Sequence, residues 1–269
     1  RGIAVVLAAA LFVVGFAAVA SASGQDAWTV AGIAPVTGEY SGIQILEAMR
    51  LASVHLNKQW GNGSLWPGCN ISVSDVDSEG IPDIAALKCF KEALLPRPPS
   101  MFVGGRRSDV TTSVALIGRV TQTPTLSYSA TSIGLTGLSR FARVVGSDGL
   151  QAQTILGFMC ALKPGWREAV AITASTDYAS SLVIALRAMA DVQGVSVSLE
   201  QHVSIAASSL HDTLVSINLA LDRVVKRNNR VIILNDEPAD ARLVLSEARR
   251  RGMIGLDQPP DSPYVWIGT

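Results

Sequence analysis

Short apolar runs alternate with amphipathic stretches along the chain, and the two kinds of segment repeat at a regular spacing. The runs have the length and composition of buried strands, and the stretches between them place apolar residues on one face of a helix. The strands predicted before residue 147 are 28–34, 71–76, 101–103, 125–128 and 141–145. The helices predicted in the same part are 43–56, 82–94 and 109–120.

A second set of alternating segments follows a long helix predicted at 148–162. Its strands are predicted at 169–173, 195–203, 231–234 and 264–267, and its helices at 178–192, 210–226 and 239–251. Alternation of this kind is typical of βαβ units and parallel sheets. The pattern therefore predicts an α/β protein with two Rossmann-like lobes, the first over 28–147 and the second over 148–269, with the sheet of the second lobe unfinished at the end of the chain.

The first 23 residues have the features of a secretory signal peptide. Residues 3–20 are apolar and carry no charge, Arg1 precedes them, and Ala20 and Ala22 frame a cleavage position. A membrane anchor that stays attached is the alternative, because the run approaches the thickness of a bilayer. Either interpretation predicts that the remainder of the chain enters the secretory pathway.

Two further features fit an extracellular protein. Asn62 and Asn70 each begin an Asn-x-Ser triplet, which is an acceptor for N-glycosylation. Cys69 and Cys89 could close a small loop as a disulfide in an oxidising compartment. Cys160 has no evident partner in the chain.

Composition and motifs exclude several classes of function. The chain has 22 basic and 22 acidic residues and a net charge of zero, so it lacks the excess of Lys and Arg that binding to nucleic acid requires. It contains no Gly-rich nucleotide loop and no nucleophile elbow. Its three histidines show no metal-ligand spacing. We therefore expect a protein that is not an enzyme and that holds no cofactor or metal.

Polar residues follow the carboxyl ends of several predicted strands, where open parallel sheets bind their ligands. They are Ser108, Ser129, Thr131, Asp148 and Tyr178. A hydroxyl at a helix start, as at Ser108, suits a carboxylate, whereas Asp148 and Thr131 suit an ammonium group. Tyr178, in the second lobe, could close over the ligand and offer its ring to the cation. Together these groups predict a site for an α-amino acid.

Each of these residues also has a purely structural interpretation. Ser108 is a good helix N-cap, and Asp148 could equally cap its own helix. Thr131 could serve only its loop, and Tyr178 could be a partly buried aromatic residue at a helix start. Only the combination of these residues favours a binding site.

Several segments resemble the extracellular ligand-binding region of class C G-protein-coupled receptors, the metabotropic glutamate and GABA receptors. The similarity is carried by residues 124–132 (PTLSYSATS), 143–148 (RVVGSD) and 151–153, together with 42–49 and 102–108. The first loop, 34–38, is similar to that of the wider periplasmic-binding-protein-like class I fold. The resemblance implies two lobes that close on a ligand like a Venus flytrap.

By position, the resemblance implies that Ser108, Ser129, Thr131, Asp148 and Tyr178 hold the α-amino and α-carboxyl groups of the ligand. Ile45 stands where the family has an Arg that binds an acidic side chain, which predicts a neutral or apolar amino acid as ligand. The resemblance implies a membrane receptor whose ligand-binding region lies on the extracellular side of the cell membrane. Its membrane region would lie beyond residue 269, and its first lobe would form a homodimer or heterodimer.

Three other functions remain open. A soluble amino-acid-binding protein that serves a transporter would use the same fold and the same site. The chain could also be the sensor domain of a receptor-type cyclase, or an inert lobe kept for dimer contacts. The coding sequence beyond Thr269 would distinguish the receptor, the cyclase and the carrier. Seven apolar segments would follow in the receptor, one in the cyclase and none in the carrier.

Overall fold

The computed structural model describes residues 27–37, 42–60, 70–162, 166–255, 258 and 263–268, which form two compact units. The first unit ends at Val145 and the second begins at Gly146, two residues before the boundary expected from the sequence. The expected signal peptide, Asn62 and Cys69 lie outside the described residues.

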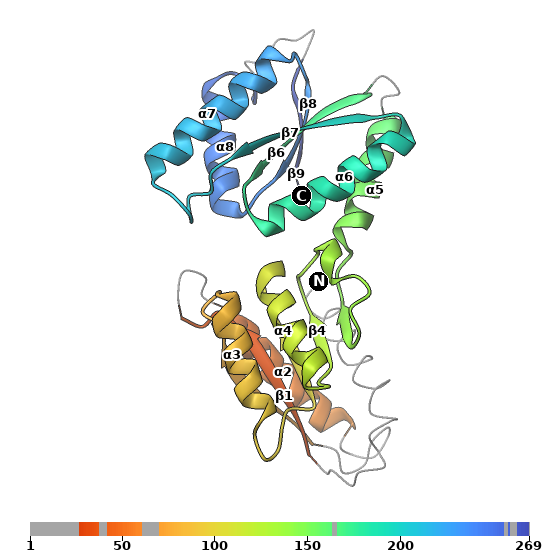
Figure 1. Ribbon diagram of the computed structural model, residues 1–269, viewed down its shortest axis with the longest axis vertical. Helices are drawn as coiled ribbons and strands as arrows, with labels where there is room; N and C mark the ends of the chain where they lie inside the picture. Colours follow the sequence, from red (N-terminus) through yellow and green to blue (C-terminus); the bar gives the residue numbers. More distant parts are fainter. Residues whose placement is uncertain are drawn as a thin grey trace. The chain divides into compact units, whose positions relative to one another are not determined.

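The first unit, coloured from red to light green in Figure 1, contains a five-stranded parallel sheet in the order β2-β1-β3-β4-β5. Its strands are β1 (Ala27–Ala34), β2 (Asn70–Asp77), β3 (Met101–Gly104), β4 (Thr125–Ser127) and β5 (Phe141–Arg143). All strands run parallel, so their carboxyl ends and the loops that follow them share one edge of the sheet.

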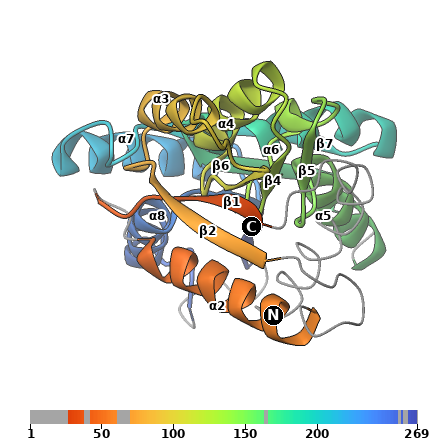
Figure 2. The ribbon, with the colours of Figure 1, turned by 90° about the horizontal axis from the view of Figure 1, so that it is seen from below.

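Helices cover both faces of this sheet. Helix α2 (Ile43–Trp60) lies on one side of β1 and β2, and α3 (Pro82–Ala93) and α4 (Ser108–Val120) lie on the other (Figure 2). The core on the α3–α4 side is built around the fully buried Phe102, with Ile33 and Val114 packed in the same cluster. On the α2 side, Leu46 and Met49 approach Gly32 so closely that a side chain there would collide with them.

The second unit repeats this arrangement with a four-stranded parallel sheet in the order β7-β6-β8-β9. Its strands are β6 (Glu168–Ala174), β7 (Ser196–His202), β8 (Val231–Asn235) and β9 (Val265–Gly268). Its helices are α5 (Asp148–Leu162), α6 (Asp177–Ala190), α7 (Leu210–Lys226) and α8 (Pro238–Arg250). Short 3₁₀ turns at Ile133–Leu135 and Asp191–Gln193 were not expected from the sequence.

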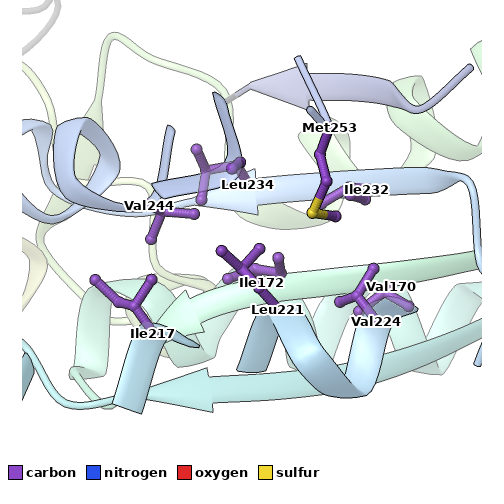
Figure 3. Packing of buried hydrophobic residues seen from close by; sticks show 10 residues of the cluster. Val170, Ile172, Ile217, Leu221, Val224, Ile232, Leu234, Val244 and Met253 are labelled. Atoms are coloured by element: carbon purple, nitrogen blue, oxygen red, sulfur yellow. The ribbon is translucent and has the colours of Figure 1, made fainter. Parts of the chain in front are cut away.

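The core of the second unit lies between its sheet and α7 and α8 (Figure 3). Val170 and Ile172 of β6 and Ile232 and Leu234 of β8 point toward these helices. The apolar stripe of α7 that faces them consists of Ile217, Leu221 and Val224, spaced at three and four residues as a buried helix face requires. The alanines that alternate with Val170 and Ile172 face the opposite side, where α6 packs beside α5.

The predicted strands and helices are confirmed, with small shifts at their ends. Helix α7 occupies the predicted range because Ser209 caps it, its hydroxyl accepting a hydrogen bond from Asp212 N–H at 3.1 Å. Helix α8 ends at Arg250, and Gly252, just after the C-cap residue Arg251, adopts a left-handed conformation with φ of 68°. Within the described residues, none of the helices combines the length and the apolar character needed to cross a bilayer.

Of the residues expected in a disulfide, only Cys89 is described. It is buried in α3 as a free thiol, and burial, assisted by the nearby Glu92 charge, raises its pKa to about 12. The pairing with Cys69 stays a prediction. Asn70, the second expected glycosylation acceptor, is exposed at the start of the edge strand β2.

Candidate functional site

The turn between β3 and α4 is built from two glycines that no other residue could replace without strain. Gly104 and Gly105 have φ of 146° and 82°. A Cβ atom at Gly104 would lie 2.2 Å from the carbonyl oxygen of Ile33, and one at Gly105 would lie 2.2 Å from Thr111 Oγ1. The turn therefore brings the start of α4 to the carboxyl edge of the sheet.

Ser108 begins α4 and is 3% exposed. Arg107 occupies the N-cap position and makes no side-chain cap, and the Ser108 hydroxyl accepts a hydrogen bond from Ser132 N–H at 3.4 Å. Ser108 thus joins the loop after β3 to the loop after β4 instead of capping its helix. Within α4, Val110 N–H already donates to Asp109 Oδ1 at 2.7 Å. The N–H groups of Ser108 and Asp109 are therefore the ones that this helix start can offer to an anion.

The loop after β4 is held by serine hydroxyls. Buried Ser127 Oγ accepts hydrogen bonds from Ser129 N–H at 3.3 Å and from Ala130 N–H at 3.0 Å. Ser129 Oγ donates to the carbonyl oxygen of Arg106 at 2.6 Å. The Ser129 hydroxyl is therefore engaged as a donor with the neighbouring loop and remains available as an acceptor.

Two side-chain hydroxyls in this loop are buried without a hydrogen-bond partner, those of Thr131 and Tyr128. Burial raises the pKa of the Tyr128 phenol well above its ordinary value, although the charge of Arg106 opposes the shift. Arg143 of β5 fixes the far end of the loop by donating to the carbonyl oxygen of Ser132 at 2.8 Å. Unpartnered buried hydroxyls in an otherwise well-bonded loop are the groups that a polar ligand would satisfy.

The first loop, after β1, is organised by Asp77 at the end of β2. Its carboxylate accepts hydrogen bonds from the Val36 N–H at 2.8 Å, the Thr37 hydroxyl at 2.5 Å and the Glu79 N–H at 2.9 Å. Burial alone would raise the pKa of Asp77, but these hydrogen bonds outweigh it and lower the pKa to about 2. Asp77 thus acts as a fixed anion that shapes the same edge of the sheet.

In the second unit, Asp148 begins α5 and is 2% exposed. Ser147 takes the capping role, since its hydroxyl accepts a hydrogen bond from Leu150 N–H at 3.4 Å. The Oδ2 atom of Asp148 is buried and has no hydrogen-bond partner. A buried carboxylate oxygen without a partner is costly, and a bound cation would remove that cost.

Tyr178 lies in the first turn of α6, as predicted, but its side chain lies outside the described part of the structure. The backbone around it is firmly held. Thr176 caps the helix by accepting a hydrogen bond from Ala179 N–H at 3.3 Å, and Asn235 Nδ2 donates to the carbonyl oxygen of Ala179 at 2.9 Å. The start of α6 is therefore anchored on both sides of Tyr178.

A buried polar cluster at the carboxyl edge of the second sheet was missed by the sequence analysis. His202 Nε2 lies 2.9 Å from Asp236 Oδ2, and neither side chain is exposed. Asp236 Oδ1 accepts a hydrogen bond from Ala174 N–H at 2.5 Å. The rule that selected Ser129 and Asp148, polar residues just past strand ends, would also have selected these residues at the ends of β7 and β8.

Three of the five expected site residues belong to the first unit: Ser108 begins α4, and Ser129 and Thr131 lie in the loop after β4, which hydrogen bonds join to the loop after β3. Their place in a binding site stays a prediction. Asp148 and Tyr178 belong to the second unit, and their place in a shared site stays a prediction. Ile45, where an Arg was expected from the resemblance, is a half-buried residue of α2. Among the described residues, no group of three His, Cys, Asp or Glu side chains could hold a metal ion.

Comparison with solved structures supports the fold. An ABC transporter substrate-binding protein from Desulfitobacterium hafniense matches with a TM-score of 0.68 and 16% sequence identity, over 90% of this chain and 66% of that chain. At this level of identity the match shows the fold alone, that of the periplasmic-binding-protein-like proteins.

Comparison with curated proteins finds metabotropic glutamate receptors. Receptor 4 of Mus musculus is 30% identical over 175 residues, which are 62% of this chain and 17% of that receptor. Receptor 8 of Homo sapiens is 26% identical over 183 residues, which are 65% of this chain and 18% of that receptor. The chain therefore spans less than a fifth of the length of these relatives.

A family of ligand-binding domains, described as the receptor family ligand binding region, matches residues 44–269. The match includes every strand and helix after β1, and both edges on which the expected ligand groups lie. Members of this family bind ligands and do not catalyse reactions. With most of its length covered by the match, the chain belongs to the receptor family ligand binding region.

Proposed function

We propose that the chain is the extracellular ligand-binding region of a membrane receptor, which captures a small α-amino acid between its two units and signals by their closure. Family membership and the similarity to metabotropic glutamate receptors support this proposal. In this proposal, a G-protein-coupled membrane region completes the protein. The chain then reaches the outer side of the cell membrane through the secretory pathway, guided by residues 1–23.

The observation that carries the proposal is the Asp148 carboxylate, which is buried with its Oδ2 unpaired. A buried carboxylate oxygen without a hydrogen-bond partner costs free energy, and a ligand that supplies the missing partner would remove this cost. An ammonium group has the charge and the hydrogen-bond donors that this carboxylate lacks.

The opposite end of the ligand is assigned to the first unit. The start of α4 offers backbone N–H groups and the Ser108 hydroxyl, which together suit the α-carboxylate. The unpaired Thr131 hydroxyl can bind either end of the zwitterion, as a donor to the carboxylate or as an acceptor from the ammonium group. Tyr178 reaches the ligand only when the units close, so its contact favours the closed state.

The experiment is isothermal titration calorimetry of this chain with the twenty proteinogenic L-α-amino acids. We expect at least one of them to bind, and we expect Asp148→Asn to weaken that binding by about tenfold or more, because the ammonium group loses its counter-charge. Absence of heat from every member of the panel would instead favour an inert domain.

A matched pair of variants separates ligand contact from folding. Thr131 and Thr125 both carry buried hydroxyls without partners, but Thr131 follows β4 at the carboxyl edge and Thr125 begins β4 at the opposite edge. Replacing either by the isosteric Val removes an unsatisfied polar group, so neither change should lower stability. Thr131→Val should weaken amino-acid binding, and Thr125→Val should leave it unchanged. Equal affinities in the two variants would exclude Thr131 from the site.

Closure itself is tested through Tyr178. Tyr178→Ala should reduce ligand affinity and also reduce the compaction that small-angle scattering detects when the amino acid is added, because the second unit loses its contact. Unchanged affinity together with unchanged compaction would contradict the closure mechanism.

A soluble carrier that delivers an amino acid to a transporter is the second candidate, favoured by the structural match to an ABC transporter substrate-binding protein. The sensor of a receptor-type cyclase is a third. The coding sequence beyond Thr269 distinguishes them, since a receptor of the first kind would show seven apolar segments, a cyclase one and a carrier none.

We also propose that the first unit forms dimers, either with a second copy or with a related chain. The neighbouring helices α3 and α4 expose large apolar side chains toward solvent. They are Leu87, Phe90 and Leu94 on α3 and its end, and Leu116 and Val120 on α4. Apolar side chains gathered on adjacent helices are typical of a protein–protein interface.

A further inference from the structure

The buried pair His202–Asp236 lies where three strands of the second sheet end, at the edge that precedes α6. His202 is the last residue of β7, and Asp236 follows the last residue of β8. The strand between them, β6, ends at Ala174 and leads within three residues into α6. Both side chains are fully buried, so the pair interacts without the screening that water and salt provide at a surface.

Both ring nitrogens of His202 face oxygen atoms. Nε2 lies 2.9 Å from Asp236 Oδ2, and Nδ1 lies 3.1 Å from the carbonyl oxygen of Val203. An imidazole with one hydrogen can donate only one of these bonds, whereas the doubly protonated imidazolium can donate both. The geometry therefore fits a charged His202 beside a charged Asp236.

The pair is connected to the segment that leads into α6 from two directions. The other oxygen of Asp236, Oδ1, accepts a hydrogen bond from Ala174 N–H at 2.5 Å. The carbonyl oxygen of His202 accepts hydrogen bonds from Ser175 N–H at 3.0 Å and from Ser175 Oγ at 3.2 Å. Ala174 and Ser175 thus receive their hydrogen-bond partners from the two members of the pair.

The same segment is held beyond Tyr178 by a residue adjacent to Asp236. Asn235 Nδ2 donates to the carbonyl oxygen of Ala179 at 2.9 Å, and the Asn235 carbonyl oxygen accepts a hydrogen bond from Thr173 Oγ1 at 2.8 Å. The end of β8 therefore contacts the chain both before and after Tyr178. A displacement at Asp236 would reach the backbone of Tyr178 through this connected set of hydrogen bonds.

One further charged group faces the pair. Asp240, in the first turn of α8, is 1% exposed and accepts hydrogen bonds from Ser204 Oγ at 2.7 Å and Ile205 N–H at 2.8 Å. From α7, uncharged Ser216 accepts a hydrogen bond from Val203 N–H at 3.0 Å. Asp240 adds negative charge near His202 and so also favours the imidazolium.

The other acid on β7 is already neutralised. Glu200 forms ion pairs with Arg223, at 3.0 Å, and with Arg227, both on α7. Among the described residues, the charged groups that act on His202 are therefore Asp236 and Asp240.

We propose that His202 and Asp236 are positioning residues for the ligand contact of α6, and that the protonated pair holds the second unit in its ligand-competent form. The proposal rests on the proposed function for the role of Tyr178. Loss of the His202 proton leaves Asp236 facing a neutral ring that can keep only one of its two hydrogen bonds. The segment 174–179 then loses part of its support, and ligand affinity falls as pH rises.

The pKa values of His202 and Asp236 are both shifted in the direction that this mechanism requires. Burial alone would lower the pKa of His202, but its hydrogen bond to Asp236 and the charge of that residue raise the pKa above the ordinary 6.5. Burial raises the pKa of Asp236, although its hydrogen bonds with His202 and Ala174 oppose the shift. Both shifts favour retention of protons by the pair, so the direction expected is loss of the His202 proton as pH rises.

The first experiment needs no ligand. Nuclear magnetic resonance of the chain follows the His202 ring and the backbone amides of Ala174 and Ser175 between about pH 5 and about pH 10. We expect the chemical shifts of the two amides to change with the same pH midpoint as the His202 ring. We expect this midpoint to lie above pH 6.5. Amides that stay fixed while the ring titrates, or a ring whose midpoint is at or below 6.5, would overturn the proposal.

The second experiment measures affinity for the tightest binder of the amino-acid panel across the same pH range. We expect at least about a fivefold loss as pH rises through the His202 midpoint, a coupling of ordinary size. His202→Gln keeps a donor for Asp236 but has no charge, and it should remove this loss. The amino group of the ligand titrates equally in both proteins, so the difference between their profiles isolates His202.

His211→Gln is the matched control, because His211 is an exposed histidine of the same unit, in the first turn of α7. Its pH profile should match that of the unchanged chain. Identical profiles for His202→Gln and the unchanged chain would refute the positioning role. If none of the twenty amino acids binds, the proposed function is refuted instead. The resonance titration would still decide whether the pair controls the segment 174–179.

Discussion

At the scale of single residues, fixed charges and unpaired polar atoms carry most of the functional information. Asp77 is the clearest fixed charge, since its carboxylate holds the first loop through Val36 and Thr37 and the following turn through Glu79. The hydrogen bonds that lower its pKa to about 2 also stabilise the folded unit.

The first prediction concerns this carboxylate. Its pKa is lower in the folded state than the ordinary 3.8, so its contribution to stability is complete above pH 3.8 and is lost as pH falls through about 2. Asp77→Asn should therefore lower the melting temperature of the first unit at neutral pH and reduce its sensitivity to acid between these two values. Circular dichroism melting across this range measures both effects.

Asp83→Asn serves as the control, because Asp83 is an exposed acid in the first turn of α3, in the same unit. It should keep the acid sensitivity of the unchanged chain. An equal loss of acid sensitivity in both variants would show that general surface charge, and not the Asp77 hydrogen bonds, sets the response.

At the scale of elements, turns decide where the helices start, and the β3–α4 turn is closely packed. Gly105 combines a positive φ of 82° with a Cβ position 2.2 Å from Thr111 Oγ1. Gly137 has nearly the same φ, 83°, but no atom lies within 4 Å of its Cβ position. Comparing the same substitution at Gly105 and Gly137 therefore separates the free-energy cost of backbone strain from that of steric collision.

The second prediction uses this pair. Gly137→Ala should cost about 1 kcal/mol of unfolding free energy, the strain of a left-handed residue. Gly105→Ala adds a collision in the packed turn and should cost more than about 3 kcal/mol, and it should also displace Ser108 and weaken amino-acid binding. Denaturant unfolding and calorimetry measure the two effects. Equal costs for the two variants would mean that the turn can relax without penalty.

At the scale of the whole molecule, the sequence was sufficient to predict the fold because strand and helix signals agree along the chain. The range of α7 follows from Ser209 at its start and from apolar residues such as Ile217 and Leu221 on one face. The two-unit organisation follows from two successive sets of alternating strands and helices.

The candidate site was predictable only in part. Ser108 and Thr131 could be selected because each follows a strand end, and the resemblance named them as well. The sequence could not show that Ser147 takes the capping role next to Asp148, since both residue types cap helices equally well. His202 and Asp236 are 34 residues apart, and only the order of the strands in the sheet brings them together.

The last prediction concerns assembly. Val120 of α4 is 73% exposed and is one of the exposed apolar residues of α3 and α4, here called the α3–α4 face, whereas Val192, 88% exposed after α6, belongs to the second unit. If the α3–α4 face is the dimer interface, Val120→Lys places a charge in it and should weaken self-association by about tenfold or more, because a buried unpaired charge is costly.

Val192→Lys changes an even more exposed valine to the same charged residue, and so it should leave self-association unchanged. Sedimentation equilibrium of the unchanged chain and of the two variants measures the dimer constant. A chain that remains monomeric at all concentrations would exclude self-association through this face and leave a related chain as its partner. Equal weakening by both substitutions would point to net charge as the cause, since the lysine at position 192 would then act without touching the apolar face.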